Sequence, residues 1–348
     1  MSRLTPIRLA GSSLAIGRAH GEVLRERIHG FLDDDLCRLN RLLDRRTSLT
    51  ALAETIGAHG AAIARDTPDL HDELRGLAEG AGIGLDAAIL LQIRREVMGY
   101  SRIPAGGDCT TLCRVRPGGA WLAQTIDLNG DLDDHMSVLG ITHAASGRRV
   151  LVVTFTGLLG YLGLNGDGLA IGLNLVLGGC WRPGVPPYLA IRHLLDHCDS
   201  VDACLERLPR LQLASSRSLT LCDRHGMAAT VELLDGQMAV TRGVDLVHTN
   251  HFLAEAFHAD DAINPFARNS SVRRLEAGRA RLAGFGDEAG PEDVLAQLSE
   301  EPIRVRGTGN PRRERTVGAV VLCPQDGLLH LRRGDPALAE TQIVPLDA

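Results

Sequence analysis

The sequence predicts an α+β protein in which helices cover two packed β-sheets. Residues 1 to about 100 carry apolar side chains at helical spacing, whereas from residue 109 onward short β-type runs are separated by Gly and Pro turns. These runs fall into two clusters with helical segments between them, the order expected when two sheets pack face to face under helices. With 348 residues, of which 44% are hydrophobic, the chain can bury a sizeable core.

The elements follow one another in a simple order. Helices are expected over Ser12–Leu32, Leu39–Ile63, Leu70–Gly82, Leu85–Val97, Tyr188–Asp196, Val201–Leu208, Ser271–Leu282 and Pro291–Leu298. Strands are expected over Cys109–Val115, Ala120–Thr125, His135–His143, Val150–Thr156, Leu169–Val176, Ser218–Cys222, Ala229–Leu233, Met238–Thr241, Val317–Leu322 and Leu328–Arg332. Residues 101–107, between the helical part and the first strand, have the composition of an exposed flexible loop.

The basic side chains narrow the possible functions, because the chain contains no lysine. A catalytic lysine, a Schiff-base lysine and a phosphate-loop lysine are therefore excluded. The formal net charge is −6 and no basic run stands out, so nucleic-acid binding is not expected.

The lengths of the apolar segments predict where in the cell the protein is located. The first 15 residues have no apolar core of a secretory signal, and no run approaches the roughly 20 apolar residues of a membrane-spanning helix. We expect a cytoplasmic protein that does not contact membranes. The eight cysteines show no paired framework, which is typical of free thiols.

One of these thiols, Cys109, stands where the glycine-containing loop meets the first predicted strand. A cut between Asp108 and Cys109 makes Cys109 a chain terminus, whose α-amino group has a pKa of about 7.7–8.0. That amine is a suitable base for the neighbouring thiol, so no histidine is required. The cut itself is an attack of the Cys109 thiol on the Asp108 carbonyl, and Gly106 and Gly107 permit the strained backbone that it needs.

Three further side chains can complete a site around Cys109. Asp127 can hold the terminal amine or the thiol, and the Asn250 amide can donate to a developing oxyanion. Arg315, at the mouth of the last hairpin, can pair with Asp127 or with a substrate carboxylate.

Five segments, in order along the chain, carry a family resemblance. They are LAIGRAHG (residues 14–21), HDELRGLAEGA (71–81), Cys109-Thr110-Thr111 with Asp127, Gly184-Val185-Pro186 with Ala190-Ile191-Arg192, and His248-Thr249-Asn250-His251. Together they resemble the acyl-CoA:6-aminopenicillanic acid acyltransferase family, also called isopenicillin N acyltransferase-like.

The resemblance implies the αββα sandwich of the N-terminal nucleophile hydrolases, with two antiparallel sheets flanked by helices and a helical N-terminal segment. It implies self-cleavage into residues 1–108, the α subunit, and residues 109–348, the catalytic β subunit. It also implies a nucleophile at Cys109, a positioning role for Asp127 and an oxyanion role for Asn250. For the late catalytic arginine of the family, Arg313 and Arg315 both lie in the right region, and we prefer Arg315. Members of the family often have Gly directly before the Cys, where this chain has Asp108.

The expected activity is hydrolysis of a small amide C–N bond, or transfer of an acyl group to a small amine, through an acyl-Cys109 intermediate. The substrate is then a small amide or acyl thioester; the sequence does not identify its acyl group or its amine. Two alternatives remain: an uncleaved Cys/His hydrolase with His248 or His251 as base, and a binding protein without chemistry. No cofactor is expected. His193 and His197 lie one helical turn apart but lack an evident third ligand, so no metal is expected.

Overall fold

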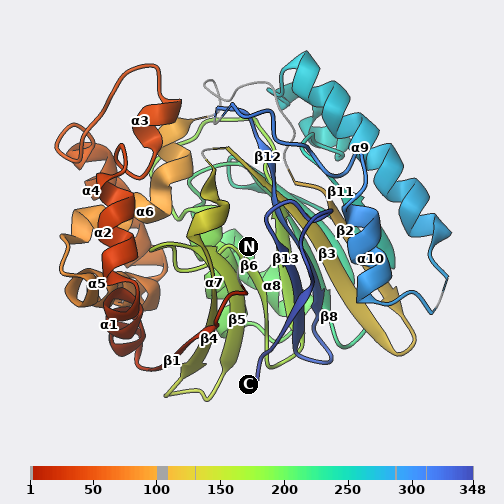
Figure 1. Ribbon diagram of the computed structural model, residues 1–348, viewed down its shortest axis with the longest axis horizontal. Coiled ribbons are helices and arrows are strands. Elements are labelled where there is room, and N and C mark those ends of the chain that lie inside the picture. The colour runs from red at the N-terminus through yellow and green to blue at the C-terminus, as the bar shows by residue number, and fades with distance from the viewer. Residues whose placement is uncertain (1–2, 100–108, 130, 287, 311, 348) are drawn as a thin grey trace.

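The computed structural model describes residues 3–99, 109–129, 131–286, 288–310 and 312–347. The predicted loop at 101–107 and the carbonyl side of the predicted cleavage point, Asp108, lie outside these residues. Six helices gather on one side of the molecule before Cys109, and the strands with the remaining helices follow, as Figure 1 shows for the described part of the chain.

The helical N-terminal part is confirmed, with two differences in detail. Its helices are α1 (Ser13–Val23), α2 (Arg25–Asp33), α3 (Leu39–Leu42), α4 (Ala53–Asp66), α5 (Pro68–Ala81) and α6 (Leu85–Met98). The first expected helix is divided at Leu24, and the second is divided between α3 and α4. In that second gap the Asn40 side chain bonds both the N–H and the C=O of Thr47, which gives the chain a local turn in place of a helical ladder.

The two helices with family-like sequences, α1 and α5, cross at contact distance. A Cβ on Gly17 of α1 would lie 1.9 Å from the Glu73 carbonyl oxygen, and a Cβ on Gly76 of α5 would lie 2.1 Å from the Leu14 carbonyl oxygen. Gly21 and Gly80 are equally tight, at 2.4 and 2.0 Å from backbone oxygens of the facing helix. The repeated glycines of residues 14–21 and 71–81 are therefore explained by backbone-to-backbone packing.

Buried polar contacts attach these helices to the rest of the molecule. The Arg192 guanidinium, on α7 (Pro187–His197), donates to both carboxylate oxygens of Glu73 on α5 at 2.9 and 2.8 Å, and both side chains are fully buried. The Gln92 amide of α6 donates to the Gly157 carbonyl at 2.8 Å and accepts from the Leu159 N–H at 3.1 Å. The N-terminal segment is thus part of the same packed structure as the sheets.

The first sheet has eight strands within the described residues, in the order β1-β4-β5-β6-β7-β8-β9-β10. The strands are β1 (Ile7–Gly11), β4 (Met136–His143), β5 (Arg149–Phe155), β6 (Leu162–Asn165), β7 (Leu169–Asn174), β8 (Arg217–Asp223), β9 (Ala228–Leu234) and β10 (Gln237–Arg242). All neighbours are antiparallel except β1, which pairs in parallel with β4. The N-terminal segment therefore also supplies an edge strand, which the sequence did not predict.

The second sheet has six antiparallel strands within the described residues, in the order β11-β2-β3-β12-β13-β14. They are β2 (Thr111–Arg116), β3 (Gly119–Leu128), β11 (Asp245–His248), β12 (Arg315–Cys323), β13 (Leu328–Arg333) and β14 (Gln342–Pro345). The β2–β3 hairpin and the β12–β3 pairing place residue 109, the end of β3 and the start of β12 next to one another. These three points frame the candidate site.

The layers are those predicted from the sequence. Strands β2 and β3 pack against β7 and β8 of the other sheet, and α7 with α8 (Val201–Arg207) covers the outer face of the first sheet. The helices α9 (Pro265–Gly284) and α10 (Pro291–Leu298) cover the outer face of the second sheet, at the right of Figure 1. Helix α9 begins earlier than expected because Asn264 caps it, accepting from the Ala267 N–H at 2.9 Å, and Pro265 follows as its first residue.

Short 3₁₀ segments occupy Leu132–His135, Leu208–Arg210 and Glu255–Asp260. Among the described residues no single helix is long and apolar enough to cross a membrane; α5 and α6 pass that test only as a pair, and they are bent by 119°.

Candidate active site

A cavity with about 810 Å³ of empty space lies beside Cys109, between the N-terminal helices and the two sheets. Its wall is mostly apolar, with a few charged side chains. It is lined by Phe31, Leu91, Gln92, Arg94, Arg95, Met98, Cys109, Asp127, Leu128, Asn129, Leu132, Phe155, Thr156, Leu158, Tyr161, Leu173, Leu175, Tyr188, Arg217 and Glu314. An apolar pocket with few convergent polar groups is typical of a small-molecule site.

The Cys109 side chain is 5% exposed and faces this cavity. Its sulfur lies 3.6 Å from the Tyr161 hydroxyl and accepts from the Asp127 backbone N–H at 3.5 Å. The Cys109 carbonyl accepts from the Asn174 amide at 2.6 Å and from the Arg274 guanidinium at 3.2 Å. Two buried donors on the carbonyl therefore hold the backbone of Cys109 in place.

Asp127, at the end of β3, also lines the cavity and is buried. Its carboxylate accepts from the Thr316 hydroxyl at 2.6 Å, and the two residues are directly paired across β3 and β12. The structure therefore brings two of the predicted residues, Cys109 and Asp127, into one cavity.

Asn250 follows β11; it is not among the residues that line the cavity, but it bonds to one that is. Its amide nitrogen donates to the carbonyl of Leu175, a cavity residue, at 3.0 Å, and its amide oxygen accepts from Arg274 at 2.7 Å. Because guanidinium groups only donate, this second contact fixes which end of the Asn250 amide carries the N–H₂. Arg274 also donates to the Thr110 hydroxyl at 3.0 Å, so one buried arginine connects the Cys109 backbone with Asn250.

Arg315, the first residue of β12, is not among the residues that line the Cys109 cavity. Its guanidinium pairs with Asp133 at 2.7 Å and Asp131 at 3.1 Å, and it borders a separate surface cavity around residues 307–310. Arg313 is exposed. The charged residue of this region that lines the Cys109 cavity is Glu314, between the two candidate arginines.

His248 and His251, the two candidate bases of the Cys/His alternative, do not line the Cys109 cavity. Both ring nitrogens of His248 face acceptors, the Glu232 carboxylate and the Thr249 carbonyl, each at 2.8 Å. The His251 ring contacts the Ser271 hydroxyl at 2.7 Å, and burial with the charges of His248 and Arg268 lowers the pKa of His251 to about 4. Among the described residues that line the Cys109 cavity there is no histidine.

Sequence reasoning missed Tyr161, Asn174 and Arg274, which surround Cys109. Asn174 and Tyr161 lie at strand ends with no local motif to mark them. Arg274 had one usable signal: Ser271 and Arg274 are three residues apart on a helix and share a face. The Ser271 hydroxyl accepts from the Asn250 N–H at 2.8 Å, so this face of α9 supports the site.

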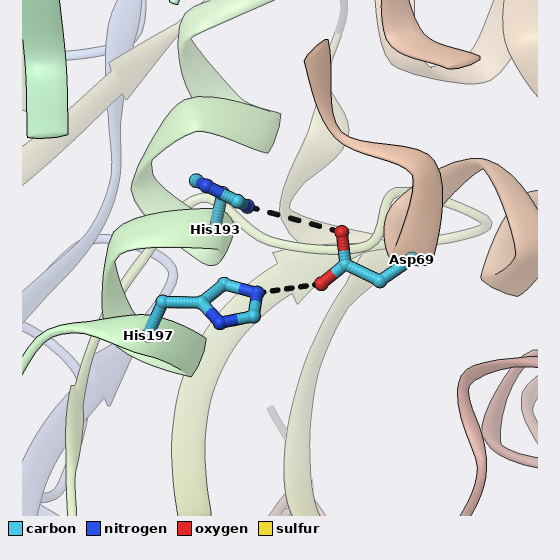
Figure 2. Close-up of side chains that lie close together, drawn as sticks. All are labelled: Asp69, His193 and His197. Atoms are coloured by element: carbon cyan, nitrogen blue, oxygen red, sulfur yellow. Dashed lines mark hydrogen bonds and ion pairs between the residues drawn. The ribbon is translucent and has the colours of Figure 1, made fainter. Parts of the chain in front are cut away.

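A second cluster, which does not line this cavity, contains His193 and His197, the two histidines considered above as metal ligands. Figure 2 shows that Asp69 of α5 supplies the third group that was not evident from the sequence, since its carboxylate lies between His193 and His197. Asp69 is 2.6 Å from the His197 ring; burial alone would raise the Asp69 pKa, but this contact outweighs it and lowers the pKa to about 2. The Arg207 guanidinium lies 3.3 Å from His193 Nε2 and opposes a divalent cation there, so the cluster is best described as a polar contact that joins α5 and α7.

Comparison with known proteins gives the family. Residues 114–337 match the family described as acyl-coenzyme A:6-aminopenicillanic acid acyl-transferase. The chain belongs to this family. A curated relative, the acyl-coenzyme A:6-aminopenicillanic-acid-acyltransferase 40 kDa form of Emericella nidulans, is 27% identical over 242 residues. That match covers 67% of this chain and 64% of the relative, less than two thirds of its length.

Solved structures give the fold. Penicillin V acylase from Agrobacterium tumefaciens matches with a TM-score of 0.51 at 13% identity, over 69% of this chain and 86% of that one. A mutant of the conjugated bile acid hydrolase from Clostridium perfringens matches with a TM-score of 0.50 at 11% identity, over 69% and 92%. The predicted α+β sandwich of the N-terminal nucleophile hydrolases is therefore confirmed.

Proposed function

We propose that the protein is a self-cleaving cysteine enzyme that hydrolyses a small amide C–N bond, or transfers an acyl group to a small amine, through an acyl-Cys109 intermediate. The observation that carries the proposal is the position of Cys109. It precedes the first strand of the second sheet, its sulfur faces a mostly apolar cavity, and two buried donors hold its carbonyl.

Self-cleavage begins at the thiol of Cys109. The sulfur attacks the Asp108 carbonyl carbon, the C–N bond breaks, and a thioester with a free Cys109 amine results. Water then hydrolyses the thioester, which returns the thiol and leaves a carboxylate on Asp108. The products are residues 1–108 and residues 109–348, which we propose as the two subunits.

In turnover the Cys109 amine takes the thiol proton while the sulfur attacks the substrate carbonyl carbon. The resulting oxyanion needs donors, and we assign the Asn250 amide to this task because its nitrogen contacts the cavity residue Leu175 and Arg274 fixes its orientation. The Cys109 ammonium then protonates the leaving amine as the C–N bond breaks, or the leaving thiol as the C–S bond breaks when the substrate is an acyl thioester. Water hydrolyses the thioester, or an acceptor amine takes its acyl group, and Cys109 is regenerated.

Asp127 has a positioning role in this scheme. Its carboxylate is held by the Thr316 hydroxyl, and its backbone N–H points at the sulfur at 3.5 Å. A backbone donor at this place stabilises negative charge on sulfur, and a carboxylate nearby favours the charged form of the amine. For Arg315, the pairs with Asp131 and Asp133 support a role in holding the loop after β3 in place.

The N-terminal fragment is part of the proposed enzyme after cleavage. Helix α6 contributes Leu91, Gln92, Arg94, Arg95 and Met98 to the cavity wall. The buried Glu73–Arg192 pair and the Gln92 contacts attach the fragment to the rest of the protein without the covalent bond at residue 108. We propose no cofactor and no partner other than this fragment and a small-molecule amide or acyl thioester.

The test is a covalent adduct. Acid-quenched protein is analysed by intact mass spectrometry after mixing with a panel of N-acyl amino acids and acyl thioesters. We expect an acyl mass increase on the fragment that begins at Cys109, in the wild type and in the Cys180→Ser control, which removes an exposed thiol. Cys109→Ala should give no adduct. An adduct on Cys109→Ala, or no adduct on any protein with any member of the panel, contradicts the proposal.

A further inference from the structure

Two of the buried cysteines, Cys198 and Cys204, lie together where helix α7 ends and helix α8 begins. Cys198 caps the C-terminus of α7, and its N–H donates to the Leu194 carbonyl at 2.8 Å. Cys204 lies within α8, and its N–H donates to the Ser200 carbonyl at 3.2 Å. The two thiols contact one another through a hydrogen bond between their sulfurs. Neither lines the Cys109 cavity, so the proposed acyl chemistry does not use them.

The surroundings of Cys198 favour its thiolate form. The hydrogen bond from the Cys204 thiol lowers the pKa of Cys198 and outweighs the opposing effect of burial. The positive charges of Arg207 and Arg148 lower this pKa further. Arg148 is held at this place, because its guanidinium donates to the Cys198 carbonyl at 2.9 Å. A thiolate beside cationic groups is the reactive form of cysteine, and a second thiol in contact with it can close a disulfide.

A second thiol pair, Cys113 of β2 and Cys222 of β8, has different surroundings. Both side chains are fully buried between the two sheets, and the contact with Cys113 together with burial raises the pKa of Cys222. Both strands have hydrogen-bonded neighbours on either side, which restrict any movement of their backbone. Cys198 instead precedes the exposed residue Asp199 in the connection between two helices. The comparison favours Cys198 as the thiol that an oxidant attacks.

We propose that Cys198 and Cys204 form a reversible disulfide when the protein meets hydrogen peroxide. The Cys198 thiolate attacks one peroxide oxygen, the O–O bond breaks, and the leaving hydroxide takes up a proton to become water. Cys198 is then a sulfenic acid, and the Cys204 sulfur attacks its sulfur atom. The S–S bond forms, the S–O bond breaks, and the oxygen leaves as water with the Cys204 proton. In sum, two thiols lose two electrons and one peroxide is reduced to two waters.

The bond closes a short ring, from residue 198 to residue 204, and ties α8 to the end of α7. Helix α7 carries Tyr188 of the cavity wall and Arg192 of the buried pair with Glu73. A crosslink removes conformations from the unfolded chain, so the oxidised protein should unfold at a higher denaturant concentration than the reduced protein. The inference does not depend on the acyl-Cys109 function.

Trypsin gives a direct readout, because the chain contains no lysine and the arginines that flank the pair are Arg192 and Arg207. Both cysteines therefore fall in one peptide, residues 193–207. Folded protein is treated with hydrogen peroxide, unfolded in the presence of an alkylating reagent, digested and analysed by mass spectrometry. We expect this peptide to carry no alkyl group and to be lighter than the reduced peptide by two hydrogen atoms. After dithiothreitol it should carry two alkyl groups, and the denaturant midpoint should return to that of the reduced protein.

Three variants and one internal standard test the order of the steps. In Cys204→Ser the reaction should stop at the sulfenic acid, which dimedone traps on Cys198, whereas Cys198→Ser should give no such adduct at residue 204. Cys222→Ser, which removes the other thiol pair, should keep the disulfide in full. The exposed Cys180 reports the peroxide dose. Two alkyl groups on peptide 193–207 at a dose that fully oxidises Cys180, or a crosslink from Cys222 in its place, overturns the proposal.

Discussion

Replacing Gly17 by Ala tests why the helical N-terminal segment has its sequence. Gly17 faces α5 with no space for a side chain: the new Cβ would lie 1.9 Å from the Glu73 carbonyl oxygen and 2.8 Å from two further backbone atoms. Backbone atoms of a helix cannot swing aside as side chains do, so the two helices must separate. Glu73 is also the buried partner of Arg192, so this separation disturbs that pair.

The size of the effect follows from two opposing terms. Overpacking costs about 1–3 kcal/mol, and a contact with backbone belongs at the upper end. Alanine is better than glycine within a helix by about 1 kcal/mol. We therefore expect Gly17→Ala to lower the free energy of unfolding by about 2 kcal/mol. Gly57→Ala is the matched control, because Gly57 is exposed within α4 and nothing lies within 4 Å of its Cβ, so this change should stabilise the protein by about 0.5–1 kcal/mol.

The assay is denaturant unfolding followed by circular dichroism, with midpoints compared at equal slope. The same chemical change, glycine to alanine within a helix, should shift the midpoint down at residue 17 and up at residue 57. A Gly17→Ala midpoint equal to or above that of the wild type would show that α1 and α5 do not cross as described.

Three more predictions concern buried charge and the site. Glu73→Gln removes one of the two buried carboxylates that pair with Arg192, which keeps Asp196 at 2.9 Å, and should cost about 1–3 kcal/mol in unfolding experiments; no measurable change would contradict the burial of the pair. Burial and the charge of Arg192 lower the pKa of His20 to about 3, so the unfolded chain takes up this proton below pH 6.5 whereas the folded chain does so only near 3. Stability should fall as the pH drops from about 6.5 toward 3, by up to about 1.4 kcal/mol per unit, and His20→Gln should reduce that slope. Asn250→Ala should lower kcat by about 10²–10³, and Arg274→Lys should lower kcat more than it raises KM, because it loosens Asn250 without touching substrate; unchanged kcat in steady-state assays would remove either residue from the site.

The parts of the fold that the sequence predicted well are those with strong local periodicity. The helices over Pro68–Ala81, Leu85–Met98 and Pro291–Leu298 carry both an apolar face and start or stop signals, and their bounds were close to those expected. The short strands Ile7–Gly11 and Asp245–His248 were missed. They form because a distant strand, β4 or β2, offers an edge, and that information is not local.

In the site, too, local sequence patterns predicted some residues, whereas contacts between distant segments were not predictable. Cys109 and Asp127 come together through a hairpin of neighbouring strands, so their proximity could be expected from sequence. Arg274 lies in a helix rich in arginine, a composition typical of a solvent-exposed face. Its burial depends on the Cys109 carbonyl and the Asn250 amide, which lie opposite it and accept its hydrogen bonds. Arg315 was placed near Asp127 by sequence, but two acidic side chains of the loop after β3 bind it instead.

The central proposal, that Cys109 becomes a chain terminus, is tested most directly by the mass of the purified, active protein. We predict two masses, for residues 1–108 and 109–348, with Cys109 as the first residue of the larger fragment, and a single uncut chain for Cys109→Ala. Activity residing in an uncut wild-type chain, or the same two fragments from Cys109→Ala, would contradict it.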